Sequence, residues 1–195
     1  MKRPTCGKME YHSPAEHKVI VTAVIVMIVL SIVDQITKWA VVSHIEFGKY
    51  VCVIPNYFDL TYIQNKGAAW GLFHEFPWIP ASISVLAFFL LMFFFRKMTE
   101  GWIERYFALA LVCSGIIGNC TDRIIRGAVV DFLRFHWHQV AEWPSFNVAD
   151  SAICCGIAVY VISSLVRPIP DSTNKNESRK TIQDSNESGS SEKPD

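Results

Sequence analysis

The apolar residues of this chain gather in four long runs, and the polar residues gather between these runs and at the two ends. Within the runs, apolar residues do not alternate with polar ones at the period of a soluble helix or strand. A helix needs about 20 residues to cross the hydrocarbon core of a bilayer, and each run is close to that length. The pattern therefore predicts four transmembrane helices, at residues 19–42, 78–95, 102–121 and 148–166.

The four predicted helices divide the chain into a membrane domain and two polar ends. We expect residues 1–18 to form a cytoplasmic N-terminal segment and residues 19–167 the membrane domain. Residues 168–195 should be a disordered cytoplasmic tail, because they include almost nothing apolar to bury. The first run is too long for a cleavable signal peptide and lacks a small-residue cleavage site, so it should remain as an anchor.

Basic residues beside the runs predict the orientation of the chain in the membrane. Short cytoplasmic flanks carry an excess of Lys and Arg. The two termini and the loop after the second run should therefore be cytoplasmic, and residues 43–77 and 121–147 should lie outside. The bias is moderate, because the outer segments carry basic residues as well. The residues behind this prediction are Lys2, Arg3, Lys8, Lys18, Arg96, Lys97, Arg105 and Arg167.

Charge and cysteine content exclude several partners. The chain has 18 Lys and Arg and 18 Asp and Glu residues, so its net charge is zero and no basic face awaits a nucleic acid. Most cysteines fall in or beside predicted helices, where cysteine behaves as a small apolar residue. Cys154 and Cys155 are adjacent, and neighbours on a helix point about 100° apart. We therefore expect no metal site. The apolar composition predicts that the chain is surrounded by membrane lipid.

Candidate chemistry lies in carboxylates placed where lipid makes charge costly. An Asp inside a helical span costs at least ~2.5 kcal/mol, so such residues usually mark function or face a partner. Asp34 and Lys38 are four residues apart and share a helix face, which favours a structural ion pair. Two further pairs have the same spacing and predict either bracing or substrate contact, namely Asp122 with Arg126 and Asn119 with Arg123.

Asp131 and Asp150 form a different kind of pair. Asp131 lies in an extended-looking run after Gly127, and Asp150 lies two or three residues inside the fourth helix. Both should lie near the outer membrane surface, without a local ion pair. Two carboxylates in a partly dry site share a proton, so one can act as general base while the other polarises a carbonyl. This is the chemistry of an aspartic protease, although spacing alone equally allows two unrelated interfacial carboxylates.

Two other classes of protein remain possible on the residues alone. A proton-coupled transporter could use Asp34, Asp131 and Asp150 as relay carboxylates, but the acidic residues collect at one surface and no broken-helix repeat is visible. A metalloenzyme could use His136 and His138, which share a face if their segment is a strand, together with Asp131. An aromatic-rich interfacial loop is the favoured explanation of these histidines.

Four segments of the chain resemble the signature of lipoprotein signal peptidases, also called signal peptidase II. They occur in the family's order between the same four helices. They are Asp34-Gln-Ile-Thr-Lys38, Asn65-Lys-Gly-Ala-Ala-Trp-Gly71, Gly118-Asn-Cys-Thr-Asp-Arg123 followed by Val129-Val-Asp131-Phe, and Phe146-Asn-Val-Ala-Asp-Ser-Ala152. The resemblance implies an all-α membrane protein with four transmembrane helices, a small extracytoplasmic β-cradle and a surface amphipathic helix. We expect the strands of the cradle at residues 50–54 and 58–63, around the turn-prone Pro55 and Asn56.

The resemblance also implies roles for individual residues. Asp131 and Asp150 match the family's catalytic aspartates, and Asp34 and Lys38 match a structural motif. Trp70, Cys113 and Ser114 depart from the usual residues, which affects fine substrate preference and leaves the reaction intact. Positions that line or brace the substrate site are matched by Asn65, Gly67, Asn119, Asp122, Arg123, Asn147 and Ala149.

The implied activity is proteolysis in the bacterial inner membrane. The family removes the signal peptide of a prolipoprotein by cleaving before a cysteine that carries a diacylglyceryl group. It needs no metal or cofactor, and its site lies near the extracytoplasmic surface. One four-helix chain completes the site, so we expect a monomer.

Overall fold

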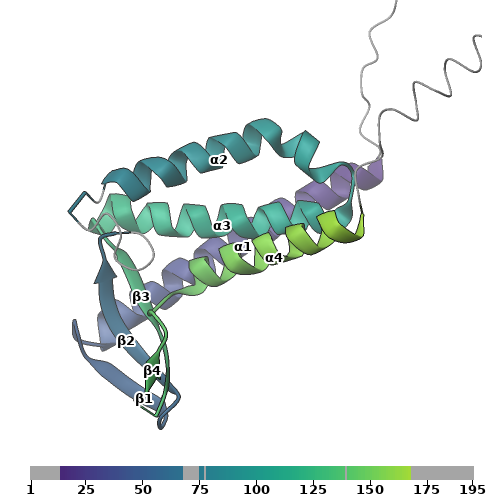
Figure 1. Cartoon of the computed structure of the whole chain (residues 1–195). Coiled ribbons are helices and arrows are strands. Elements are labelled where there is room, and N and C mark those ends of the chain that lie inside the picture. Colours follow the sequence, from purple (N-terminus) through teal and green to yellow (C-terminus); the bar gives the residue numbers. More distant parts are fainter. Residues whose placement is uncertain (1–13, 68–74, 77, 139, 168–195) are drawn as a thin grey trace, which may run out of the picture. The chain divides into compact units, whose positions relative to one another are not determined.

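The computed structural model describes residues 14–67, 75–76, 78–138 and 140–167 (Figure 1). In these residues four helices are long and apolar enough to cross a membrane, which confirms the predicted fold class. The arrangement discussed below concerns residues up to 161, which form one compact unit. The helices are α1 (Pro14–His44), α2 (Trp78–Thr99), α3 (Ile103–Arg126) and α4 (Val148–Val166).

Three of the four helices have bounds that differ from those of the predicted spans. The fourth span has its predicted bounds, whereas the first two helices continue beyond their apolar runs. The third continues past Thr121 to Arg126, because Asp122 and Arg126 pair with each other and the helix can carry them. It ends at Gly127, whose left-handed φ of 73° lets its N–H donate to the Arg123 carbonyl at 3.2 Å.

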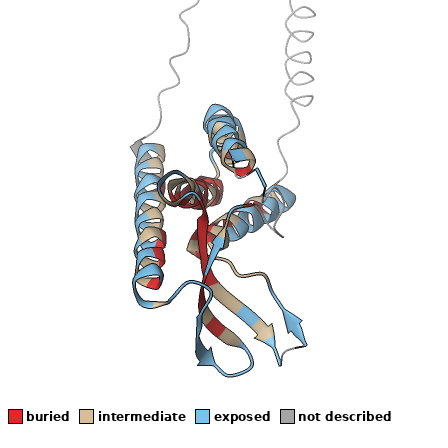
Figure 2. Ribbon diagram, turned by 90° about the vertical axis from the view of Figure 1, so that its left-hand side faces the viewer, coloured by how far each residue is buried: buried red, intermediate tan, exposed pale blue. Residues whose placement is uncertain are grey.

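α3 is the central helix of the bundle. It packs against α1 and α2, and 56% of its most apolar window is buried, far more than in the other helices. Glycines bring α3 and α4 together: a Cβ at Gly115 would lie 2.3 Å from the Ala149 carbonyl oxygen, and one at Gly156 would lie 2.6 Å from that of Ala108. The outer faces of the other helices are exposed and apolar, as expected of surfaces that meet lipid (Figure 2).

A four-stranded antiparallel sheet follows the C-terminal end of α1, with the order β1-β2-β3-β4. Its strands are β1 (Tyr50–Ile54), β2 (Phe58–Asn65), β3 (Val129–Trp137) and β4 (Ala141–Glu142), so both predicted strands and the extended run around Asp131 are confirmed. The first half of β3 is buried (Figure 2). Val130 and Phe132 pack with Val41 of α1 and Tyr62 of β2, which holds Asp131 between them at the end of the bundle.

Some expectations fall on residues that are not described. The described ranges contain no fifth, surface-lying helix. Trp70 and Gly71 lie in residues 68–74, and the expected tail lies in residues 168–195, all outside the described residues.

Candidate active site

Asp131 is held on β3 by two side-chain amides. The residue is 4% exposed. Asn65 of β2 donates to Oδ2 through Nδ2 at 3.1 Å, and Asn147 donates to Oδ1 through Nδ2 at 2.8 Å. Asn65 is itself fixed, because its Oδ1 accepts a hydrogen bond from the Gly67 backbone N–H at 3.0 Å. Both oxygens of Asp131 therefore have defined donors.

Asp150 is fixed by its position in the first turn of α4. The N-cap residue of this helix, Asn147, accepts the Asp150 N–H at Oδ1 (2.9 Å), and the Asp150 carboxylate accepts the Asn147 N–H at Oδ2 (3.2 Å). This reciprocal arrangement is a capping box, in which the N-cap residue and the third residue of the helix bond to each other. The start of α4 therefore fixes the side chain of Asp150. Asn119 of α3 donates to the second oxygen, Oδ1, at 2.7 Å.

Asn147 links the two aspartates directly. It is fully buried, and it donates to Asp131 through its side chain and to Asp150 through its backbone. Among the described residues, every hydrogen-bond partner of the two carboxylates is a neutral amide. Arg134, three residues from Asp131 in sequence, points elsewhere: it contacts Glu142 at 2.6 Å and lies 3.9 Å from Asp59.

The surroundings favour a protonated Asp131. Burial, together with the nearby negative charge of Asp150, raises the pKa of the Asp131 carboxyl to about 7, although the amides of Asn65 and Asn147 act in the opposite direction. Two carboxylates that interact in this way titrate as a pair. At neutral pH the pair can therefore hold one proton between its two members, the state that general acid–base chemistry requires.

The two aspartates open onto a cavity of about 480 Å³. Its polar side is formed by the carboxylates with Asn65, Asn119 and Arg123. Its remaining walls are largely apolar or aromatic and include Val129, Trp143, Pro144, Phe146, Ile153 and Cys154. A cavity of this size and lining can hold several residues of an apolar peptide.

Arg123 is the cation that faces this cavity. It donates through Nη2 to the Gly67 carbonyl at 3.2 Å and through Nη1 to the Asn119 carbonyl at 3.4 Å. The predicted pairing of Asn119 with Arg123 therefore runs through a backbone oxygen. The Arg123 Nε–H is buried and has no hydrogen-bond partner in the described part of the chain, so it can receive an acceptor that enters the cavity.

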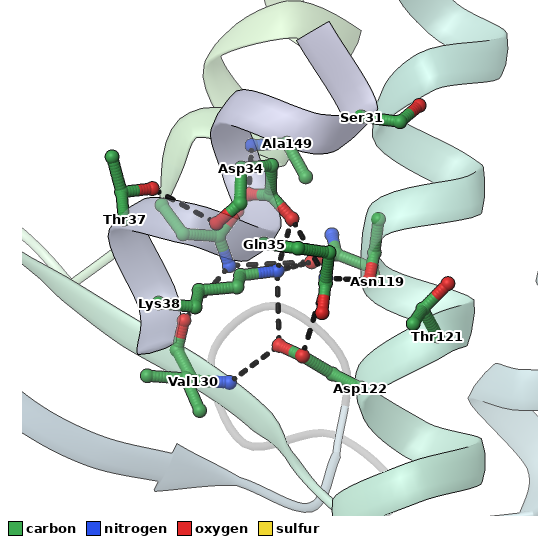
Figure 3. A network of polar contacts seen from close by, with 12 residues as sticks. Ser31, Asp34, Gln35, Thr37, Lys38, Asn119, Thr121, Asp122, Val130 and Ala149 are labelled. Carbon is green, nitrogen blue, oxygen red and sulfur yellow. Dashed lines mark hydrogen bonds and ion pairs between the residues drawn. The ribbon is translucent and has the colours of Figure 1, made fainter. Parts of the chain in front are cut away.

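A second polar group contacts the elements that carry the carboxylate pair, and we call it the ion cluster. It consists of Asp34, Gln35, Lys38 and Asp122, which Figure 3 labels, together with Arg126. The spacing of four residues brings Lys38 Nζ to 2.8 Å from Asp34 Oδ2, and the same nitrogen lies 2.9 Å from Asp122 Oδ2 on α3. Arg126 completes the cluster through Asp122 and donates to Gln35 Oε1 at 3.2 Å. Asp34, Lys38 and Asp122 are at most 1% exposed.

The ion cluster joins the elements that carry the aspartates. Asp34 Oδ1 accepts the Ala149 N–H of α4 at 2.9 Å, and Asp122 Oδ2 accepts the Val130 N–H of β3 at 3.0 Å. Gly118 makes room for this packing, since a Cβ there would lie 2.5 Å from Asp34 Oδ2. The residues after Ala149 and Val130 are Asp150 and Asp131, so the cluster fixes the backbone beside each of them.

Sequence reasoning missed two parts of this arrangement. Gln35, which donates to the Gly118 carbonyl at 3.1 Å, was not singled out, although a polar residue inside an apolar run is a signal. The reach of Lys38 to Asp122 and Asn119 depends on how α1 packs against α3, and no local pattern encodes it.

The two rival readings do not fit this geometry. β3 ends at Trp137, so His138 does not share a strand face with His136, and the premise of the metalloenzyme is wrong. His136 Nε2 lies 3.0 Å from Asp59, and the described residues contain no group of three metal-ligating side chains. Asp34, the proposed third relay carboxylate of a transporter, is held in contact with Lys38.

Fold and site together define a multi-pass membrane protein with a hydrolase-like carboxylate pair at one end of its helix bundle. A family model described as "Signal peptidase (SPase) II" matches residues 26–166. With that match, the chain belongs to the signal peptidase II family, and the family prediction is confirmed.

Similar proteins agree in sequence and in fold. The lipoprotein signal peptidase of Syntrophotalea carbinolica is 42% identical over 135 residues, covering 67% of this chain and 83% of that protein. The lipoprotein signal peptidase of Symbiobacterium thermophilum is 35% identical over 137 residues, covering 70% and 90%. A solved structure of a bacterial membrane enzyme superposes with a TM-score of 0.69 at 30% identity, covering 75% of this chain and 88% of the other.

Proposed function

We propose that this protein is an aspartic peptidase that removes signal peptides from bacterial prolipoproteins, with Asp131 and Asp150 as its catalytic pair. One observation carries the proposal. The two carboxylates are bridged by Asn147, their partners among the described residues are neutral, and they face one cavity. The names of the related lipoprotein signal peptidases support the choice of substrate.

The reaction uses the pair as one unit. A water molecule between the carboxyl groups gives a proton to the ionised member, and its oxygen adds to the carbonyl carbon of the scissile bond. The protonated member keeps its proton and donates a hydrogen bond to the carbonyl oxygen as that oxygen gains negative charge. The C–N bond of the tetrahedral intermediate then breaks, and the leaving amine takes a proton from the pair, which returns the site to its starting state.

The remaining residues of the site hold the substrate and the catalytic groups. Asn65, Asn119 and Asn147 orient the carboxylates, and Gly67 and Ala149 supply backbone contacts beside them. Arg123, with an Nε–H that has no partner among the described residues, is suited to bind a carbonyl oxygen of the substrate. Asp122, Asp34 and Lys38 brace the site from behind.

Placement in a membrane makes this function physically sensible. The apolar signal helix and the acyl chains of a diacylglyceryl-modified cysteine reside in lipid, and a peptidase between membrane helices can meet the scissile bond there. We propose that the site lies near the extracytoplasmic surface of the inner membrane and that both termini are cytoplasmic. Labelling of a cysteine placed at residue 175 from outside intact cells would contradict this topology.

The direct test uses purified protein in detergent. A diacylglyceryl-modified precursor should be shortened by cleavage before the modified cysteine, and mass spectrometry of both products locates the cut. A precursor with Ser in place of that Cys, which cannot be lipidated, should remain intact. Cleavage of neither precursor would contradict the proposed function, and equal cleavage of both would contradict the proposed substrate.

A further inference from the structure

Lys38 makes three contacts that use all of its hydrogen-bond donors. Its Nζ lies 2.8 Å from Asp34 Oδ2, 2.9 Å from Asp122 Oδ2 and 3.1 Å from Asn119 Oδ1, and its side chain is completely buried. An ammonium group has three N–H donors and no acceptor. The first two contacts neutralise charge, but the third is to a neutral amide, and charge balance alone does not explain it.

The third contact determines which way the Asn119 amide points. Because Lys38 can only donate, the Asn119 atom that faces it is the oxygen, and the amide nitrogen faces the opposite side. There it donates to Asp150 Oδ1 at 2.7 Å. Asn147 Nδ2 contacts the same Asn119 oxygen at 3.2 Å and reinforces this orientation. Asp150 thus receives a hydrogen bond from an amide that a buried cation polarises.

Asp131 lacks such a connection. Its donors are Asn65 and Asn147, and the Asn65 oxygen accepts only a backbone N–H, that of Gly67, among its described contacts. The charged groups around Asp150 are Lys38 and Asp34 of α1, Arg123 of α3 and Asp131 of β3. The charges of Lys38 and Arg123 reach both aspartates, but only Asp150 receives a hydrogen bond from an amide that Lys38 holds.

We propose that Lys38 is a positioning residue that acts through Asn119 to hold Asp150 as the ionised member of the pair. Asp150 is then the group that takes the proton from water, and Asp131 carries the shared proton. This inference rests on the proposed function and assigns the two roles that the symmetric chemistry leaves open. The difference in burial acts in the same direction, because Asp131 is buried and Asp150 is half-buried, and a drier site disfavours the charged form more strongly.

The test removes Lys38 without leaving an unbalanced charge. Asp34→Asn combined with Lys38→Met deletes one positive and one negative group, and the pair of Asp122 with Arg126 remains. We expect kcat to fall about tenfold or more with little change in KM, since the reacting group is affected and the cavity is not. The acid limb of the kcat–pH profile, which reports ionisation of the base, should move to higher pH by about one unit.

Arg126→Gln is the matched control. Arg126 belongs to the same ion cluster, but its polar partners among the described residues are Asp122 and Gln35, and Asn119 is not one of them. We expect this variant to melt at a lower temperature and to keep the acid limb at the wild-type pH. An unmoved limb in the Lys38 variant would overturn the inference, and so would an equal shift in the Arg126 variant.

Two further measurements keep the test decisive. If the first double variant fails to insert, Lys38→Met with Asp122→Asn carries the same expectation. This variant retains Asp34 of α1, which accepts the Ala149 N–H at the start of α4. Wild-type protein and Asp150→Asn are assayed alongside on the same lipidated precursor. A wild type that does not cleave contradicts the proposed function itself. A wild type that cleaves, beside a Lys38 variant with an unchanged profile, contradicts only the role of Lys38.

Discussion

Two pairs of carboxylates lie at the same end of this bundle, and they differ in what stands between their members. Asp34 and Asp122 are joined by the ammonium of Lys38, at 2.8 and 2.9 Å. Asp131 and Asp150 are joined by the neutral residue Asn147. Both pairs consist of the same side chains in buried or partly buried surroundings, so the intervening group determines the chemistry.

The difference explains why one pair is structural and the other is suited to catalysis. In the first pair the ammonium of Lys38 lies between the carboxylates and offsets their mutual repulsion, and both members are at most 1% exposed. In the second pair the repulsion persists, a shared proton relieves it, and a cavity gives a substrate access. A buried ion pair breaks at high cost when one partner is removed, whereas a proton-sharing pair gains from losing a charge.

The largest expected effect is on the catalytic pair. Asp131→Asn and Asp150→Asn each keep the size of the side chain and remove its ionisable group, so each should lower the cleavage rate by about 10³-fold or more. The melting temperature should stay the same or rise. Asp122→Asn is the same exchange in the other pair, and it should leave measurable turnover. A dead Asp122 variant that is still folded would require a third catalytic carboxylate.

A cation placed beside Asp131 should make the pair of Asp131 and Asp150 resemble the charge-compensated pair of Asp34 and Asp122. Asn65→Lys introduces an ammonium where Asn65 now donates at 3.1 Å, and it should favour the ionised Asp131. We expect a loss of cleavage of about 10²-fold or more, because the proton needed for general acid catalysis is no longer held. Asn65→Gln lengthens the side chain without charge and should retain more activity. Equal activity of the two variants would argue against proton sharing.

Removal of Lys38 alone, without a compensating change at Asp34 or Asp122, should also lower stability. Lys38→Met leaves Asp34 and Asp122 close together with less than their full compensating charge, and breaking a buried ion pair in this way costs about 3–5 kcal/mol. A thermal melt in detergent should show a large decrease in melting temperature. The exposed Lys49 offers a matched exchange, Lys49→Met, which should change the melting temperature little. A stable Lys38→Met protein would show that the ion cluster does not hold the fold.

The smallest expected effect is the pH dependence of stability. The pKa of Asp131 is raised to about 7 in the folded protein from an ordinary value near 4, so the folded state binds more protons than the unfolded state between these values. The contribution of Asp131 to stability is therefore most favourable at low pH and declines as the pH rises from about 4 to about 7. Melts across this range should show a weaker decline in Asp131→Asn. An identical pH dependence in the two proteins would contradict the raised pKa.

Sequence alone predicts the membrane helices and both strands of the β1–β2 hairpin, because apolar runs and β-prone segments are local signals. The fourth span was predicted to the residue, and the third was ended five residues early. A run of polar residues normally closes a span, but here Asp122 and Arg126 neutralise each other within the helix. A local pattern reveals this compensation only when the spacing of four residues between opposite charges is taken to lower the cost of placing them in lipid.

Sequence reasoning can propose residues for the candidate site, but it reveals few of the contacts between them. Asp131 and Asp150 were singled out by depth, and the remaining positions by resemblance to a family. The bridging role of Asn147 and the contact of Lys38 with Asn119 depend on packing between segments 16 and 81 residues apart. Such contacts follow from the close approach of α3 to α1 and α4, which Gly115 and Gly118 permit.

The most direct test of the central claim is a double-mutant cycle on the catalytic pair. Single-turnover cleavage of a diacylglyceryl-modified precursor is measured for Asp131→Asn, Asp150→Asn and the double variant, each shown to be folded by its melt. Residues that act as one unit lose nearly everything when either is removed. The account therefore predicts that the double variant is scarcely slower than either single variant. Substantial cleavage by a folded single variant, or losses that simply add in the double variant, would contradict it.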